Sequence, residues 1–202
     1  MNVDVITPMP LSMLNHFWNR EFGDSPPMAH LLRASFPSRW VRFHSLADSQ
    51  RYPNNDGEWK ALLERHNAVL SALADDRCEL QLLTTSYSAT PTLESPDQAI
   101  LNVGINALHW RSVSMHEIES DPDPNFWHIF STSIEWGPNV LDDVLRLVAE
   151  DQVRNVMILD PRASWLYHPY DGGADVILAS TSDRDRLAEK HKTWLSPRTD
   201  GL

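Results

Sequence analysis

A histidine and two aspartates bracket the Gly172-Gly173 pair, and an arginine and a histidine from the first half of the chain could join them. The candidate catalytic residues are therefore His168, Asp171, Asp175, Arg42 and His44. An imidazole beside carboxylates can perform general acid–base chemistry or divalent-metal hydrolysis. The simpler interpretation, which we favour, is structural, because aspartate before a Gly-Gly pair commonly forms a turn.

Other catalytic and ligand-binding signatures are absent from the sequence. The nine histidines show no HExxH or paired CxxC spacing, and no GxSxG, SxxK or cysteine-centred nucleophile motif is present. Gly172-Gly173 is the only glycine pair, and it does not lead into a predicted helix, so no phosphate-binding loop is indicated. We therefore expect no metal site and no cofactor.

The eight tryptophans offer a different kind of site. Most of them fall in predicted helices or strands, where an aromatic side chain usually belongs to the core. Exposed Trp and Tyr residues are common hot spots of protein interfaces. Trp40, Tyr52 and Tyr170 are the candidates for such a partner-binding face.

The formal net charge of −11 restricts the class of partner. Nucleic-acid binding depends largely on clustered Lys and Arg that neutralise phosphates, and the 17 basic residues form no run longer than two. An acidic surface favours a basic protein partner through electrostatic steering. Simple solubility explains the same charge without any partner.

Length and composition predict one domain over residues 1–202, with residues 1–39 as an N-terminal helical arm. The single cysteine, Cys78, is typical of a reducing compartment. No apolar run reaches the ~20 residues that span a bilayer, and the first ten residues lack a signal-peptide pattern. The expected location is the cytoplasm, with no membrane contact.

The stretch from 155 to 195 is the most regular part of the sequence. Three short apolar runs, at 155–160, 165–170 and 175–180, predict antiparallel strands that precede a helix at 182–195. Pro169 predicts a bulge or an edge position for the second strand, and the glycine pair predicts a turn, where glycine allows positive φ at no steric cost. Ser182 and Asp185 resemble a capping box at the start of the helix.

Periodicity also assigns most of the remaining chain, except for residues 28–39. Helices are predicted at 11–22, at 59–73 and from Pro138 onward, with Asp142 and Asp143 in the first turn of the last. Strands are predicted at 40–44, 78–84, 107–117 and 126–136, with a turn at 121–124 and a long loop at 86–98. This order predicts an α+β fold: a single, mostly antiparallel sheet with helices packed on it, ending in a β-meander and a C-terminal helix. A sheet with one parallel pair is the alternative.

Two motifs connect the chain to a known family. The first joins residues 40–46 (WVRFHSL) to Arg51-Tyr52-Pro53 and 64–67 (ERHN), and the second joins residues 168–177 (HPYDGGADVI) to Trp194-Leu195-Ser196. With these motifs the chain resembles a family of small bacterial proteins known as a domain of unknown function. The resemblance implies a bacterial cytoplasmic domain and supplies no catalytic residues. Similar small acidic proteins are often the antidotes of toxin–immunity pairs.

The favoured functional hypothesis is a non-enzymatic, immunity-like domain that neutralises or docks a basic protein partner. Its basis is the negative charge, the tryptophan content and the lack of a recognised catalytic motif. One alternative is a hydrolase that uses the His/Asp cluster at the Gly172-Gly173 turn. Another is a structural subunit of a larger assembly, and the oligomeric state is left open.

Overall fold

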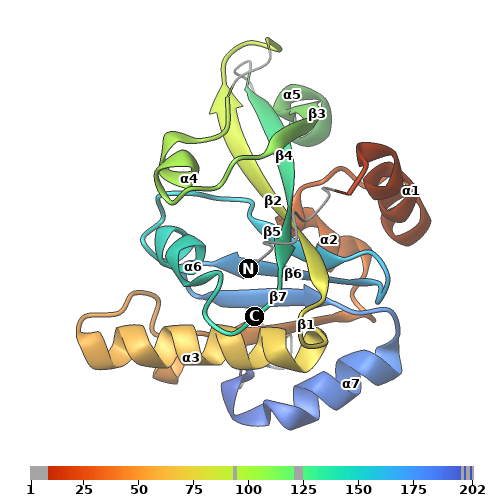
Figure 1. The fold of residues 1–202 in the computed structure, drawn as a ribbon. Helices are drawn as coiled ribbons and strands as arrows, with labels where there is room; N and C mark the ends of the chain where they lie inside the picture. Colours follow the sequence, from red (N-terminus) through yellow and green to blue (C-terminus); the bar gives the residue numbers. More distant parts are fainter. Residues whose placement is uncertain (1–8, 93–94, 121–124, 197, 199–200, 202) are drawn as a thin grey trace, which may run out of the picture.

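The computed structural model describes residues 9–92, 95–120, 125–196, 198 and 201, and it places seven strands in one sheet (Figure 1). Every strand pair is antiparallel, in the order β1-β7-β6-β5-β2-β4-β3. The strands are β1 (Trp40–His44), β2 (Glu79–Ser88), β3 (Leu108–Ser114), β4 (Phe126–Glu135), β5 (Met157–Asp160), β6 (Trp165–Tyr170) and β7 (Gly173–Ile177). The α+β prediction is confirmed, and no parallel pair occurs among these strands.

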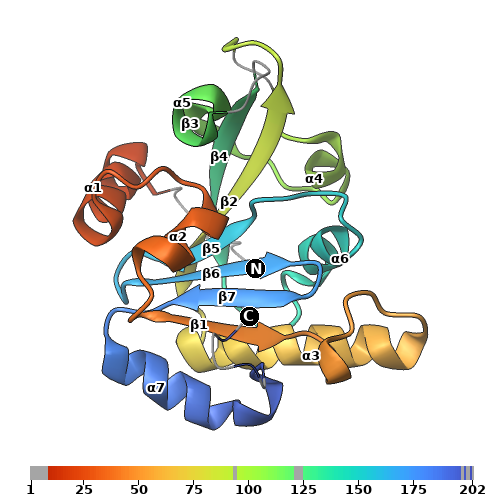
Figure 2. The same cartoon turned by 180° about the vertical axis from the view of Figure 1, so that it is seen from behind.

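The helices lie on both faces of this sheet, as the two opposite views show (Figures 1 and 2). Two short 3-10 helices, Ala47–Ser49 and Lys192–Trp194, accompany the α-helices. The α-helices are α1 (Leu11–Phe22), α2 (Ala29–Ser35), α3 (Asp56–Leu73), α4 (Gln98–Asn102), α5 (Met115–Glu119), α6 (Asp142–Ala149) and α7 (Thr181–Lys190). Within the described ranges, every helix is either too short or too polar to span a lipid bilayer.

The closing meander forms as predicted, although its turn and its helix cap differ in detail. Tyr170 pairs with Gly173, so the β6–β7 turn has two residues and β7 starts two residues earlier than expected. Neither glycine of the pair has positive φ. Gly173 is needed because a Cβ there would collide with the backbone oxygen of Phe43 on β1. Helix α7 is capped by Ser180 rather than Ser182, because the Ser180 side chain accepts the backbone N–H of Asp183.

Pro169 is neither bulged nor at an edge, contrary to the prediction. Strand β6 lies between β5 and β7, and Pro169 pairs in regular register with Ala174 of β7. The pairing of β6 with β5 ends at Tyr167. Pro169 therefore lies past the last ladder bond on that side, where a missing N–H costs no hydrogen bond.

Three predicted boundaries in the middle of the chain also need correction. The strand predicted at 107–117 ends at Ser114, because residues 115–119 form α5, so His116 is helical rather than on the strand with His109. The helix expected from Pro138 begins at Asp142, with both aspartates in its first turn. Strand β2 takes in residues 86–88 of the predicted loop, and α4 begins at Gln98. The turn predicted at 121–124 lies outside the described residues.

Side chains that alternate along the strands build a separate apolar core on each face of the sheet. The core under α3, α6 and α7 contains sheet residues such as Val41, Leu82, Ile158, Tyr167 and Val176. The core under α1 and α2 contains Leu83, Ile129, Met157, Leu159, Leu166 and Ile177. The N-terminal helices, expected as an arm, thus share a core with the sheet.

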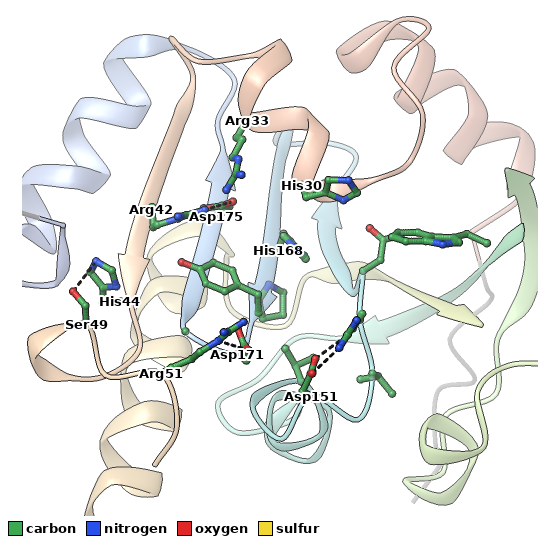
Figure 3. Close-up of a pocket in the computed structure, with 18 residues that line it drawn as sticks. His30, Arg33, Arg42, His44, Ser49, Arg51, Asp151, His168, Asp171 and Asp175 are labelled. Carbon is green, nitrogen blue, oxygen red and sulfur yellow. Dashed lines mark hydrogen bonds and ion pairs between the residues drawn. The ribbon is translucent and has the colours of Figure 1, made fainter. Parts of the chain in front are cut away.

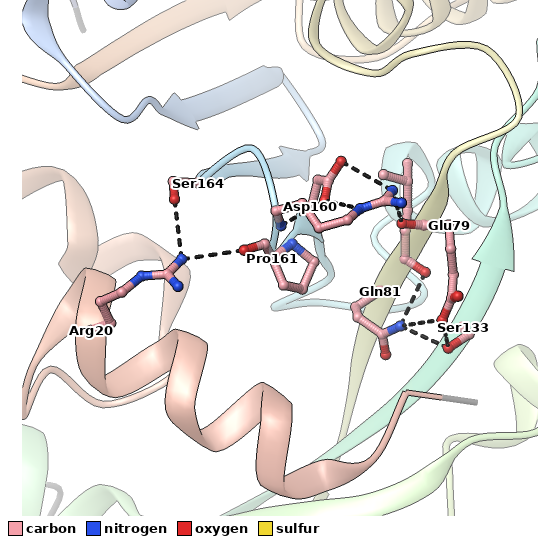
Figure 4. A network of polar contacts seen from close by, with 9 residues as sticks. Arg20, Glu79, Gln81, Ser133, Asp160, Pro161 and Ser164 are labelled. Atoms are coloured by element: carbon pink, nitrogen blue, oxygen red, sulfur yellow. Dashed lines mark hydrogen bonds and ion pairs between the residues drawn. The ribbon is translucent and has the colours of Figure 1, made fainter. Parts of the chain in front are cut away.

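Polar contacts at the β5–β6 turn fasten α1 to the sheet (Figure 4). Arg20 of α1 donates from Nη2 to the Pro161 carbonyl oxygen and to Ser164 Oγ, each at 3.2 Å. On the other side of the turn, Arg162 bonds the Asp160 carboxylate and donates to the Glu79 carbonyl oxygen at 3.0 Å. The turn therefore connects α1 to the start of β2.

A buried polar chain crosses the core under α3. His66 Nε2 lies 2.9 Å from Ser45 Oγ, and His66 Nδ1 lies 2.5 Å from the Tyr167 hydroxyl. All three residues are buried. Burial disfavours the charged imidazolium and lowers the pKa of His66 to about 4.

This lowered pKa predicts acid destabilisation of the fold. The pKa of His66 is lower in the folded chain than in the unfolded one, so the unfolded chain binds more protons between about pH 6.5 and pH 4. The stability is therefore fully present above pH 6.5 and is lost as the pH falls toward 4. At 1.36 kcal/mol per pKa unit, the loss from His66 approaches about 3 kcal/mol.

Urea unfolding of the wild type and of His66→Gln between pH 7 and pH 4 would measure this effect. The stability advantage of the wild type should shrink by about 3 kcal/mol over that range. Titration of the other histidines cancels in the difference between the two proteins. An advantage that stays constant with pH would contradict the prediction.

Candidate functional site

A pocket of about 650 Å³ lies on the α2 side of the sheet, over the ends of β1, β7 and β6 (Figure 3). Its volume is in the range of small-molecule sites. Its polar lining comes from the three strands, from the β6–β7 turn, from α2, from residues 49–51 and from residues 151–155. These polar residues are His30, Arg33, Arg42, His44, Ser49, Arg51, Asp151, Arg154, Asn155, His168, Tyr170, Asp171 and Asp175.

The pocket forms where the apolar alternation of the strands changes to a polar one. On this face of the sheet, β6 presents Leu166 to the core and then His168 and Tyr170 to the pocket. Strand β7 likewise presents Ile177 to the core and Asp175 to the pocket. The same face of the sheet is therefore core at one end and pocket at the other.

An ion pair between neighbouring strands forms one wall of the pocket. Arg42 of β1 and Asp175 of β7 are register partners, and both Asp175 oxygens accept from the guanidinium, at 2.8 and 3.2 Å. The side chains are only 12% and 6% exposed. The guanidinium also lies 5.5 Å from the Trp40 ring and 5.0 Å from the Tyr170 ring. The charge pair is thus held between two aromatic faces.

Asp171, in the β6–β7 turn, binds the segment that follows β1. Its Oδ2 atom lies 2.5 Å from Arg51 Nε and accepts from the Tyr52 hydroxyl at 2.9 Å. The carboxylate favours the charged guanidinium and raises the pKa of Arg51. The Arg51 side chain is 65% exposed, so this ion pair lies at the rim of the pocket.

Asn155 positions the opposite wall. Its side chain accepts from the Ala29 backbone N–H at 2.9 Å and donates to the Pro27 carbonyl oxygen at 3.1 Å, which fixes the start of α2. Helix α2 in turn places His30 and Arg33 at the pocket, and Arg33 extends toward the Arg42–Asp175 pair (Figure 3). Arg33 has no hydrogen bond or ion pair with the part of the chain that the structure describes.

Two histidines of the pocket favour the neutral form. The Nδ1 atom of His168 lies 2.8 Å from the Val156 carbonyl oxygen, and burial lowers the pKa of this imidazole. Burial, followed by the positive charges of Arg42 and Arg65, also lowers the pKa of His44. Both rings are therefore hydrogen-bonding groups rather than cations at neutral pH.

The structure brings all five candidate catalytic residues to this one pocket, which the sequence left open. Of the three partner-binding candidates, Tyr170 lines the pocket, Tyr52 is exposed beside Asp171, and Trp40 packs against Arg42. Sequence reasoning did not select Arg33, Arg51, Arg154 or Asn155 as site residues. The polar positions on the strands were a visible signal, whereas residues 28–39 gave no periodic pattern and Asn155 was assigned to the strand predicted at 155–160, which begins at Met157.

The pocket is better suited to binding an anion than to acid–base chemistry by its carboxylates. Each aspartate in its lining faces an arginine, with Arg154 Nη2 lying 2.7 Å from Asp151 Oδ2 to complete the third pair. A carboxylate that is neutralised in this way is a weak base. Among the described residues, no group of three or more His, Cys, Asp or Glu side chains is placed to hold a metal ion.

Comparison with protein families matches residues 28–199 to a family described as "Domain of unknown function (DUF3885)". The resemblance inferred from the sequence motifs is confirmed at this level. Comparisons with curated proteins and with solved structures return no match.

Breaking the buried Arg42–Asp175 ion pair should lower the stability of the fold substantially. Asp175→Asn removes the negative charge that faces the Arg42 guanidinium, and breaking a buried pair in this way should lower the free energy of unfolding by about 3 kcal/mol. Chemical denaturation would measure the change. Asp151→Asn is the matched control, since its pair with Arg154 is largely exposed and should contribute less than about 1 kcal/mol. Equal losses in the two variants would contradict the assignment.

Proposed function

The chain belongs to the DUF3885 family, and we propose that it is a binding domain whose pocket takes a small molecule carrying a phosphate-type anion. One observation carries the proposal. Four arginines from four separate segments of an acidic chain line a single pocket. They are Arg33 of α2, Arg42 of β1, and Arg51 and Arg154 from two loops.

The charge balance inside the pocket opposes that of the whole chain. The net charge of the sequence is −11, yet the lining has four arginines against three aspartates. These charged side chains leave one positive charge over. Planar guanidinium groups bind phosphate oxygens through paired hydrogen bonds, which makes arginine well suited to this ligand class.

Arg33 is the principal anion-binding residue in this proposal. The other three arginines each contact an aspartate, whereas Arg33 pairs with no described carboxylate. Arg51 and Arg154 are exposed at the rim, and their side chains can turn toward a ligand. A phosphate would thus bind Arg33 and take further hydrogen bonds from those N–H groups of the rim arginines that do not face their aspartates.

The proposal retains one functional expectation drawn from the sequence and changes another. The proposal keeps the preference for a binding domain over an enzyme and replaces the basic protein partner with a small anion at the pocket. An immunity-like protein contact elsewhere on the acidic surface stays a prediction. Hydrolysis at the His/Asp cluster also stays a prediction. The pairing of Asp171 and Asp175 with arginines does not favour it.

Calorimetric titration with inorganic phosphate would test the proposal. The wild type should bind phosphate at one site, more weakly as salt is added, because salt screens exposed charges. Arg33→Gln should weaken the binding at least about tenfold, since it removes a charge-assisted contact of ~1.5–3 kcal/mol. Arg77→Gln is the control, because it removes the same charge from an exposed position on the α3–β2 turn.

Two results would overturn the proposal. One is a wild type that does not bind phosphate at low salt. The other is equal weakening by Arg33→Gln and Arg77→Gln, which would indicate a general charge effect rather than a site.

A further inference from the structure

The pocket has two chemically different parts. Its rim contains the exposed guanidinium groups of Arg51 and Arg154. Its floor contains the buried residues His168 and Asp175, and the buried carboxylate of Asp171 joins the floor to the rim through its ion pair with Arg51. An inorganic phosphate would occupy only a small share of the 650 Å³, so the floor is available for the rest of a larger ligand.

His168 presents a hydrogen-bond acceptor to the floor. The partner of its Nδ1 atom is the Val156 carbonyl oxygen, and a carbonyl can only accept, so Nδ1 carries the proton. In the neutral ring Nε2 is then a lone-pair acceptor. Nε2 has no hydrogen bond with the residues described, although the side chain is more than nine-tenths buried and lines the pocket. Because Nε2 is not sealed from solvent, it opens into the pocket and can accept a hydrogen bond from a ligand.

Asp171 presents a second acceptor beside it. Both of its described contacts, from Arg51 and Tyr52, fall on Oδ2. Oδ1 receives no hydrogen bond from the described chain and is not sealed from solvent. Because Arg51 already balances the charge of this carboxylate, a neutral hydroxyl suits Oδ1 better than a second cation.

We propose, on the basis of the proposed function, that the ligand is a sugar phosphate. Its phosphate binds Arg33 and the rim arginines, and its hydroxyl groups donate to His168 Nε2 and Asp171 Oδ1. The combination of cationic donors with neutral or charge-balanced acceptors in one pocket matches a phosphorylated polyol. It matches an inorganic anion or an ammonium phosphate less well.

A panel of four probes tests this assignment by calorimetry: ribose 5-phosphate, inorganic phosphate, ribose and phosphoethanolamine. Ribose 5-phosphate should bind at least about tenfold more tightly than inorganic phosphate, since the two added hydrogen bonds, one of them to a charged carboxylate, are together worth at least that factor. Ribose alone should bind far more weakly than its phosphate. Phosphoethanolamine, which carries an ammonium group in place of hydroxyls, should bind no better than inorganic phosphate.

His168→Asn then separates the two ends of the ligand. The asparagine amide can still donate to the Val156 carbonyl oxygen, but it does not reach the position of Nε2. Its affinity for ribose 5-phosphate should fall about tenfold, while its affinity for inorganic phosphate stays unchanged and shows that the pocket is intact. His168→Gln, which can place an amide oxygen near the Nε2 position, should restore part of the loss.

The outcomes distinguish this inference from the function on which it rests. If neither inorganic phosphate nor ribose 5-phosphate binds, the proposed function fails. If inorganic phosphate binds and ribose 5-phosphate binds no more tightly, only the sugar assignment is overturned. Tighter binding of phosphoethanolamine would also overturn it, as would equal weakening of both phosphates by His168→Asn. Should neither His168 variant fold, the wild-type panel alone still decides.

Discussion

The ion pair between Arg42 and Asp175 is the constraint on which the pocket depends. It lies between two adjacent strands of a sheet, at positions where the same face elsewhere contains apolar side chains. Two charges can remain this far from water only because they satisfy each other through two hydrogen bonds and lie against the Trp40 and Tyr170 rings. The pair keeps this end of the sheet polar, and α2 and the two loops enclose the space above it.

The helices and strands could be predicted largely from the sequence because their signals are local. Alternation gave the bounds of β1 and β6, and helical spacing gave those of α1. The errors arose at positions where contacts with other strands determine which residue is tolerated. Pro169 is tolerated inside the sheet because its neighbour β5 has already ended, and Gly173 is required by the approach of Phe43 from another strand. Neither fact is encoded within a short window of sequence.

The candidate site was also predictable only in the part that has a local sequence signal. His168, Asp171 and Asp175 stood out because they bracket the glycine pair, and Arg42 and His44 because they lie on one face of a predicted strand. The β1–β7 register brings the two groups together. Arg33 and Arg154 could not be found in this way, since a surface arginine on a helix or in a loop has no periodic signature. Asn155 was hidden for another reason. Its role depends on contacts with residues more than a hundred positions earlier in the chain.

Alternation along β1, β6 and β7 has a consequence for how relatives of this chain could diverge. Val41, Tyr167 and Val176 point into the core under α3, whereas Arg42, His168 and Asp175, each one residue away, point into the pocket. Replacing His168, or Arg42 and Asp175 together so that neither charge is left unpaired, leaves the packing of the first set in place. One scaffold could thus acquire new ligand preferences through a handful of exchanges, with its architecture unaltered.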